Sequence, residues 1–361
     1  MNILAFESSC DETSAAVVYA DELGNFEIKS NIIASQIEIH KLYGGVVPEI
    51  ASRAHIEAIS NITYEALEVA ALTISDIDVV AVTASPGLIG ALLVGVNFAK
   101  GLAIANSIPL VAVDHIKGHI ASVYLTKDAP KPPLIALTAS GGHTSIYKVD
   151  SYESITAIGS TRDDAIGESF DKIGRIIGIP YPAGKGFDKL SERGFERATG
   201  LTIDTPRIYE KYKKSAAYKD ANMYLPSPAL NDGTLDFSFS GLKTASINLL
   251  HRYEQRGEEI DKELFAARYT YEAVEAVSKK IAAALREYPG YALTISGGVA
   301  ANSHLRRRLT EIAEDAGTQI YIPPLSLCGD NAAMIAAAGY YEYKNNNISD
   351  SSLNASAMDS V

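Results

Sequence analysis

The sequence predicts an α/β fold made of two related halves, and three observations support this prediction. First, strand-like and helix-like patterns alternate along the 361 residues. Second, a hairpin pattern of two apolar strands around a short polar turn occurs once in each half. Third, an apolar strand near the C-terminus runs through a glycine pair into an amphipathic segment. A repeated plan of this kind indicates an internal duplication.

The first hairpin is read from NILAFESS as one strand, CDET as the turn and SAAVVYA as the second strand. Its tip is crowded with polar residues, namely Ser8, Ser9, Asp11, Glu12 and Thr13. The second hairpin is PPLIALTAS and SIYKVD around GGHT, with Gly141 and Gly142 at the tip. Such tips expose backbone N–H groups that can bind phosphate. Each one could also be an ordinary hairpin, but their recurrence favours a shared role.

The third glycine signal lies in YALTISGGVAANSHLRRRLTEIAEDAG, where a strand passes through Gly297 and Gly298 into a helix. A glycine turn lets a nucleotide approach the backbone closely, and the N-terminus of the following helix favours an anion. An ordinary connection between a strand and a helix would look the same. The glycine turn is therefore evidence for nucleotide binding only in combination with the two hairpins.

Bulk properties limit the possible setting of the chain. Its length and its 47% hydrophobic content predict about two folded domains. The most apolar stretch, residues 85–107, contains Asn97, Lys100 and several glycines, and we interpret it as a buried helix in preference to a membrane span. No secretory leader pattern opens the sequence, and Cys10 and Cys328 are far apart, which favours a reducing cytosol. The net charge of −12 argues against non-specific nucleic-acid binding, although a local basic patch could still contact RNA.

The stretch HIKGH places His115 and His119 four residues apart, so on a helix both rings project from one face. In the H-E-x-x-H motif of zinc proteases the second residue is the glutamate that activates water, but here it is Ile116. Asp330 precedes a helix of small residues and could be its N-cap. Joined to the two histidines, it would complete a two-histidine, one-carboxylate set that suits Fe(II) or Zn(II). Spacing alone does not bring the three together, and a structural role for the histidines stays open.

Nine blocks resemble the TsaD family of tRNA adenosine threonylcarbamoyltransferases, formerly described as O-sialoglycoprotein endopeptidases. In order, they are ESSCDETSAAV, HKLYGGVVPEIASRAHIE, SPGLIGALLVG, HIKGH, SGGHTSI, DDAIGESFDKIGRIIG, FSFSGLKTA, SGGVAANSHLR and CGDNAAMIAAAG. The resemblance implies an actin and sugar-kinase-like (ASKHA) fold of two related domains around a nucleotide cleft. We expect residues 1–120 with about 329–344 in the first domain and residues 121–328 in the second. The polar segment 345–361 is expected to be disordered.

The resemblance also implies a reaction. Members of the family transfer the threonylcarbamoyl group of threonylcarbamoyl adenylate to the exocyclic amine of the adenosine beside the anticodon, in tRNAs that read codons beginning with A. The implied metal ligands are His115, His119 and Asp330, holding Fe(II) or, as a second choice, Zn(II). The implied substrate-binding residues are Thr138, Ala139, Ser140, Gly141, Gly142, Asp171, Gly184, Asp188 and Asn302. Protein partners of the TsaB and TsaE type and a cytoplasmic location are implied as well.

Other functions and roles remain open from the sequence. Asp11 and Glu12 could accept the proton that the attacking amine loses, hold a metal-bound water or only form the turn, and we favour a catalytic role. The Tyr- and Lys-rich stretch 205–228 could bind tRNA through phosphate contacts and base stacking, or be a solvated helix or loop. A sugar kinase or ATPase would explain the hairpins but not the histidines. A metalloprotease would explain only the histidines, and a non-catalytic scaffold would not need a metal.

Overall fold

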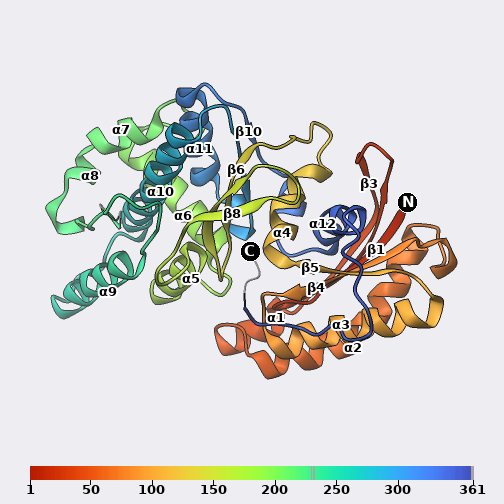
Figure 1. Ribbon diagram of the computed structural model, residues 1–361. Coiled ribbons are helices and arrows are strands. Elements are labelled where there is room, and N and C mark those ends of the chain that lie inside the picture. The colour runs from red at the N-terminus through yellow and green to blue at the C-terminus, as the bar shows by residue number, and fades with distance from the viewer. Residues whose placement is uncertain (229, 231, 359–361) are drawn as a thin grey trace. The chain divides into compact units, whose positions relative to one another are not determined.

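The computed structural model describes residues 1–228, 230 and 232–358. Its chain forms two compact units. The first unit contains residues 1–132, 150–155 and 323–361, and the second contains residues 133–149 and 156–322. Each unit is built on its own five-stranded sheet (Figure 1).

The sheet of the first unit has the order β3-β2-β1-β4-β5. Its strands are β1 (Asn2–Glu7), β2 (Glu12–Ala20), β3 (Phe26–Ser35), β4 (Val79–Ser85) and β5 (Leu110–Asp114). β1 and β2 form the expected antiparallel hairpin, with Glu7 opposite Ser14 at its tip. β4 runs parallel to β1, and β5 runs parallel to β4. The carboxyl ends of β1, β4 and β5 therefore meet at one edge of the sheet.

Helices cover both faces of this sheet (Figure 1). They are α1 (Ile37–His40), α2 (Pro48–Val69), α3 (Ile89–Asn106), α4 (His115–Ala121) and α12 (Ala332–Lys344). α2 and α3 pack on the face that carries Leu4, Phe6 and Val82, and these residues belong to one buried apolar cluster. α12 packs on the opposite face, where a Cβ added at Gly339 would lie 2.7 Å from the Cβ of Ala81. The C-terminal helix thus returns to the first unit.

The second unit repeats this plan. Its strands are β6 (Leu134–Ala139), β7 (Thr144–Val149), β8 (Ile155–Ser160), β9 (Ala292–Ser296) and β10 (Ile320–Tyr321), in the order β10-β9-β6-β7-β8. β6 pairs antiparallel with β7 and parallel with β9, as β1 pairs with β2 and β4. The two sheets have the same order when their strands are counted from β1 and from β6. The predicted duplication is confirmed.

The helices of the second unit lie mostly between β8 and β9 in sequence. They are α5 (Ile166–Ile176), α6 (Gly184–Thr199), α7 (Ile208–Lys214), α8 (Ala216–Lys219), α9 (Ser240–Gln255), α10 (Lys262–Glu287) and α11 (Ser303–Ala316). α10 packs against α6, α9 and α11. Its side chains are buried along most of its length, which makes it the central helix of this layer.

The observed units differ from the expected division at residues 121–132, 150–155 and 323–328, which belong to the first unit, and in the C-terminal tail. Residues 121–132 stay with the first unit, because Tyr124 packs edge-on against Tyr152 and Tyr341. The expectation of a disordered tail was wrong for residues 345–358, and residues 359–361 lie outside the described part. The backbone N–H of Ser349 donates to the carbonyl of Leu110 at 2.8 Å, so the tail covers part of edge strand β5. The polar composition of this tail was a poor guide to its structure, because the contact with β5 is made by backbone groups.

α3 contains the apolar stretch that we interpreted as a buried helix. Among the described residues it is the one helix long and apolar enough to cross a membrane by length and composition. Its residues Leu92, Val96 and Ala99 are fully buried against the sheet. A Cβ at Gly95 would collide with the hydroxyl of Ser8, so the glycine permits close packing on the first hairpin. The helix is therefore part of the core on this face, while Ile104 and Ile89 are exposed.

Candidate active site

The two histidines of HIKGH lie in the short helix α4, which begins where β5 ends. The carboxylate of Asp114 caps this helix by accepting the backbone N–H groups of Ile116 and Lys117. His115 and His119 consequently project one turn apart on one face, with their ring centroids 4.5 Å apart. A Cβ at Gly118 would lie 2.6 Å from Ile335 Cδ1, so this glycine lets α4 approach α12.

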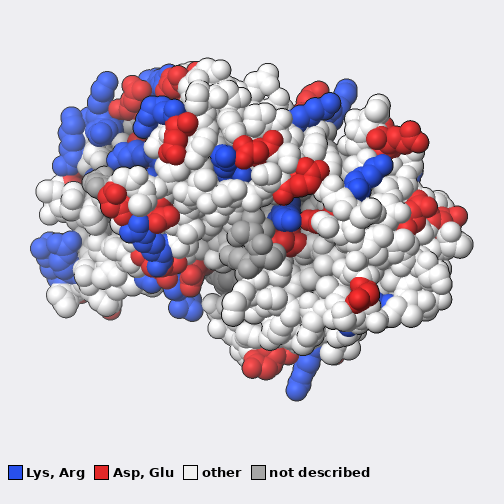
Figure 2. All heavy atoms as spheres, in the orientation of Figure 1, with Lys and Arg blue, Asp and Glu red and all other residues white. Residues whose placement is uncertain are grey.

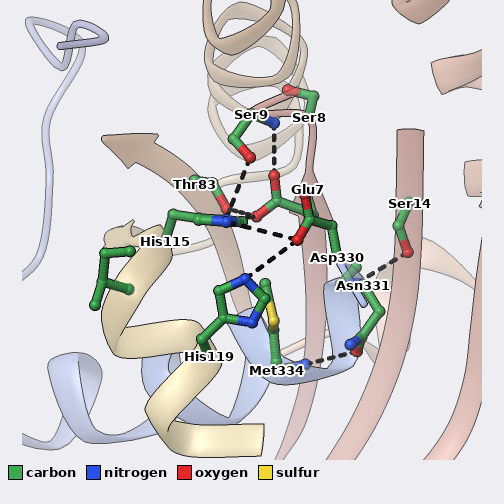
Figure 3. Close-up of polar contacts among 12 residues, drawn as sticks. Glu7, Ser8, Ser9, Ser14, Thr83, His115, His119, Asp330, Asn331 and Met334 are labelled. Carbon is green, nitrogen blue, oxygen red and sulfur yellow. Dashed lines mark hydrogen bonds and ion pairs between the residues drawn. The ribbon is translucent and has the colours of Figure 1, made fainter. Parts of the chain in front are cut away.

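Asp330 reaches the histidines from the residue before the N-cap of α12 (Figure 3). Its Oδ1 lies 3.2 Å from His119 Nε2 and 3.6 Å from His115 Nε2. The alternative that Asp330 caps α12 is wrong, because the side chain of Asn331 accepts the N–H of Met334 at 3.1 Å. Because Asn331 caps the helix, the carboxylate of Asp330 is not used as the cap and is directed at the imidazole rings of His115 and His119.

The three side chains fit a metal ion by their geometry. One ligand atom from each of His115, His119 and Asp330 lies within 4.8 Å of the other two. His119 is fully buried. Its Nδ1 has no hydrogen-bond partner within the described residues, and its Nε2 lies 3.2 Å from Asp330 Oδ1 without hydrogen-bond geometry. An unsatisfied buried polar group costs about 1–3 kcal/mol, and ligation of a cation by His119 Nε2 would remove that cost. Two imidazoles and one carboxylate form a donor set typical of Fe(II) and Zn(II).

Buried charges around this cluster shift one another's pKa values. Burial opposes protonation of His115, but the carboxylates of Glu7 and Asp330 raise its pKa to about 9. Burial alone would raise the pKa of Glu7, yet His115 holds it below its ordinary value. Burial, followed by Asp330 and Asp11, raises the pKa of Glu12 to about 9. Excess negative charge is therefore concentrated at this end of the sheet, which favours a bound cation.

Asp11 and Glu12 lie at the tip of the first hairpin, as predicted. Asp11 is buried, and Glu12 begins β2 with Ser35 Oγ donating to its carboxylate at 3.4 Å. Asp330 acts electrostatically on Glu12, so Glu12 lies near the candidate metal ligands. Whether either residue is catalytic stays a prediction.

Sequence reasoning missed Glu7, the last residue of β1. Its buried carboxylate contacts His115 Nδ1 at 2.9 Å and accepts from Thr83 Oγ1 at 2.7 Å (Figure 3). A glutamate that ends an apolar strand directly before a polar tip was the available signal. Such a buried charge requires partners.

In the second unit, the two glycine signals lie together at the ends of β6 and β9. Gly297 has φ +86°, and a Cβ there would collide with the carbonyl of Ala139. Thr138 Oγ1 and Ser296 Oγ are 3.2 Å apart on the same paired strands. Around Gly141 and Gly142, by contrast, an added Cβ would meet nothing within 4 Å. The hairpin tip is thus open, as a phosphate-binding turn requires.

The remaining predicted substrate residues form two contacts near these turns. Ser140 is next to Gly167 at the start of α5, where an added Cβ would collide with its carbonyl. One turn further along α5, Asp171 Oδ1 accepts the N–H of Ala183 at 2.6 Å, directly before Gly184. Asp188 accepts from Asn302 Nδ2 at 2.8 Å and also from the hydroxyl and N–H of Ser303. The structure brings Asp171 beside Gly184, and Asp188 beside Asn302; their role in substrate binding stays a prediction.

The Tyr- and Lys-rich stretch 205–228 has a different structure from the one proposed for base stacking. Tyr209 and Tyr212 are buried in the core, and Tyr212 stacks on Phe195 with centroids 4.1 Å apart. These rings are therefore not available to RNA bases. Lys211 and Lys213, in contrast, are exposed on α7. The residues at 229 and 231 lie outside the described part of the chain.

A family model described as TsaD: tRNA N6-adenosine threonylcarbamoyltransferase matches residues 27–337. The chain belongs to the TsaD family. The tRNA N6-adenosine threonylcarbamoyltransferase of Clostridium botulinum (strain 657 / Type Ba4) is 47% identical over 343 residues, covering 95% of this chain and 93% of the relative. The protein of the same name from Geobacillus thermodenitrificans (strain NG80-2) is 47% identical over 354 residues, covering 98% and 95%.

The chain also has the actin and sugar-kinase-like fold, as expected. HypF from T. kodakarensis matches with a TM-score of 0.52 and 13% identity, covering 98% of this chain and 49% of that one. Full-length HypF, solved in a phosphate- and nucleotide-bound form, matches with a TM-score of 0.51 and 16% identity, covering 95% and 46%. At these identities the likeness concerns the fold alone.

Two alternative functions lose support from the geometry of this candidate site. Ile116, at the position of a protease glutamate, is fully buried in the core and offers no base. A sugar kinase would leave the convergent ligand atoms of His115, His119 and Asp330 without a role. The curated relatives above are named as transferases.

Proposed function

We propose that the chain transfers the threonylcarbamoyl group of threonylcarbamoyl adenylate to the exocyclic amine of the adenosine beside the anticodon, in tRNAs that read codons beginning with A. The observation that carries this proposal is the family match across residues 27–337. The convergence of His115, His119 and Asp330 supports it, because those ligands are the ones the family resemblance implies.

In the proposed step the amine nitrogen attacks the carbamoyl carbon of the mixed anhydride. A new C–N bond forms, the C–O bond to phosphate breaks, and AMP leaves with the electron pair. The amine proton passes to a carboxylate at the first hairpin tip, for which Asp11 and Glu12 are the candidates. A cation held by Asp330 would offset part of the negative charge that raises the pKa of Glu12, and would so favour its ionised, proton-accepting form. An aromatic amine is a weak nucleophile, so alignment and activation of the carbonyl should matter more than a strong base.

His115, His119 and Asp330 would hold one divalent cation, with Fe(II) as the first choice and Zn(II) as the second. A cation bound there supplies Lewis-acid polarisation of carbonyl or phosphate oxygens. This role needs no activated water, which would only hydrolyse the anhydride. Ile116 in place of a protease glutamate fits such a role, since no general base for water is required.

The second unit is proposed to hold the adenylate. Its open glycine tip at Gly141 and Gly142 and the turn at Gly297 present backbone N–H groups near the ends of β6 and β9. The further contacts are proposed from Thr138, Ala139, Ser140, Asp171, Gly184, Asp188 and Asn302. The contact of Thr138 with Ser296 at the strand ends, and that of Asp188 with Asn302 after the second strand, support the assignment.

The tRNA substrate is proposed to contact the second unit through exposed lysines. That unit carries 24 Lys and Arg against 23 Asp and Glu, whereas the first carries 8 against 21. On the face shown in Figure 2, Lys and Arg side chains gather over α7 and α8. Phosphate binding depends on local cationic charge and not on the net charge of the whole chain. The excess of acidic residues lies in the first unit, so it does not prevent the second unit from binding RNA. TsaB-like and TsaE-like partners and a cytoplasmic location complete the proposal.

Reconstitution tests this function. The purified chain is combined with a threonylcarbamoyl adenylate synthase, candidate partners, ATP, bicarbonate, threonine and unmodified tRNA, and the nucleosides are analysed by mass spectrometry. We expect threonylcarbamoyladenosine in the digest. Absence of this product despite measured adenylate formation, together with phosphorylation of a sugar by the chain alone, would support the kinase alternative.

A further inference from the structure

Glu7 is a buried carboxylate whose contacts all lie inside the first unit. Its side chain has 0% exposure. Oε2 lies 2.9 Å from His115 Nδ1 and accepts from Thr83 Oγ1 at 2.7 Å, while Oε1 accepts the N–H of Ser9 at 2.5 Å. Burying a charge is costly unless it is paired and hydrogen-bonded, and these contacts supply the pairing.

The contact with His115 determines which ring nitrogen carries a proton. An ionised carboxylate only accepts hydrogen bonds, so Nδ1 of His115 must be the donor. In the neutral ring, Nε2 is then left with its lone pair. That nitrogen is the one that faces Asp330, with Oδ1 at 3.6 Å, and it is therefore the ligand atom (Figure 3).

We propose that Glu7 is the positioning residue of the metal site, which fixes the tautomer and orientation of His115 and makes its Nε2 a stronger ligand. A carboxylate behind a ligating histidine commonly has this effect. The inference rests on the proposed metal site. It extends that site by a residue that does not touch the metal, and it gives the buried carboxylate a function.

The same carboxylate connects the metal site to the first hairpin tip. Ser9 donates its N–H to Glu7, and its carbonyl accepts the N–H of Leu88 at 2.8 Å. A Cβ at Gly87 would lie 2.6 Å from that carbonyl, so the loop before α3 approaches it closely. Glu7 thus holds the backbone of the tip that carries Asp11 while it orients His115. Glu7 thereby connects His115, a proposed metal ligand, to the hairpin tip that carries Asp11, a proposed proton acceptor.

Titration of the full-length chain with Co(II) tests this role. Binding of Co(II) is followed by its visible absorption, and competition with Zn(II) compares the affinities of the variants. Glu7→Gln keeps the shape of the side chain but removes the charge that fixes the tautomer. We expect metal affinity to fall about 10–100-fold, the usual effect of losing such a partner. The Co(II) absorption bands should also shift, because the basicity of His115 changes.

Two further variants in the same titration make the result decisive. Thr83→Val removes another hydrogen bond from Glu7 but leaves its carboxylate beside His115, so it should lower the melting temperature and keep most of the metal affinity. His119→Ala removes a ligand and should abolish tight binding. Wild-type affinity in Glu7→Gln with loss in His119→Ala would overturn the role of Glu7 alone. Wild-type affinity in both variants would overturn the metal site itself. Equal affinity losses in Glu7→Gln and Thr83→Val, at equally lowered melting temperatures, would indicate a structural role for Glu7.

Discussion

At the scale of single residues, His119 is the position where a role as metal ligand and a purely structural role predict different outcomes. Its ring is fully buried and its Nε2 lies 3.2 Å from Asp330 Oδ1, so replacing it removes one donor from the proposed metal site. We expect His119→Ala to lose metal and tRNA modification together, with metal affinity reduced at least as much as the roughly 10–100-fold that loss of a supporting residue costs. Elemental analysis and modification assays on the same preparation measure both.

His304→Ala is the matched control, because His304 is also fully buried and lies in the second unit against Phe195. Both substitutions remove the same ring from a packed interior and should lower the free energy of unfolding by similar amounts. Only His119→Ala should release the metal. A His119→Ala protein that kept metal and activity would contradict the proposed site.

Asp171 offers a second test at this scale, directed at the substrate. Asp171→Ala should weaken binding of a non-reactive threonylcarbamoyl adenylate analogue about 10–100-fold, as expected for hydrogen bonds from a charged group. Bound metal should not change, since Asp171 is not among the three clustered ligands. Calorimetry with elemental analysis measures both quantities, and loss of metal would contradict the assignment.

Asp171→Asn is the control for the local turn. The asparagine oxygen can still accept the N–H of Ala183, whose contact with Asp171 is 2.6 Å long. If the carboxylate binds substrate, the Asn variant should be nearly as defective as Ala. Recovery of wild-type affinity by Asn would show that Asp171 acts by holding the turn before Gly184.

The sequence indicated the candidate metal ligands more clearly than the residues that surround them. His115 and His119 were recognisable by helical spacing, and Asp330 by the chemistry that a third ligand would complete. The role of Glu7 did not follow from its local signal, because its partners Thr83 and His115 are 76 and 108 residues away. Contacts of that kind depend on strand order, which local patterns do not specify.

At the scale of elements, α12 determines where Asp330 lies. The helix packs closely on the sheet, and a Cβ at Gly339 would lie 2.7 Å from Ala81 Cβ, which cannot rotate away. We expect Gly339→Ala to destabilise the fold by about 1–3 kcal/mol through overpacking. Metal affinity should fall as well, because a displaced helix moves the carboxylate. Denaturant unfolding and Co(II) titration measure the two effects.

Gly241→Ala in α9 is the control for this substitution. An added Cβ there would meet nothing within 4 Å, and Gly241 is the second residue of its helix, so alanine should leave the stability nearly unchanged. If both glycine variants were equally stable and bound metal normally, close packing of α12 would not position Asp330.

The pattern of elements was largely predictable from alternation and glycine turns, including both hairpins and the strand before Gly297. The same reasoning failed where composition was the only guide. Tyr209 and Tyr212 looked available for stacking among charged neighbours, but on a helix their spacing gives one buried face. The polar tail at 345–358 bonds through its backbone, which composition does not show.

At the scale of the whole molecule, charge is divided unequally between the two units. The second unit holds three quarters of the basic residues, 24 of 32. On α7, Lys211, Lys213 and Lys214 are exposed, while Tyr209 and Tyr212 anchor the helix from its buried face. This arrangement holds three cations outward on a fixed element, which suits contacts with a phosphate backbone.

Replacing these three lysines by glutamine should therefore weaken tRNA binding at low salt and flatten its salt dependence, by roughly 0.7–0.9 in log–log slope for each phosphate that is no longer neutralised. Lys41, Lys127 and Lys131, exposed on the first unit, provide a control triple variant with the same change in net charge. If only the total field of the protein mattered, both triple variants would bind tRNA with equally reduced affinity. Filter binding across a salt series measures the tRNA affinity of both variants, with metal content as a check on folding. A larger loss of affinity in the α7 variant would locate the RNA contact on the second unit, and equal losses would refute it.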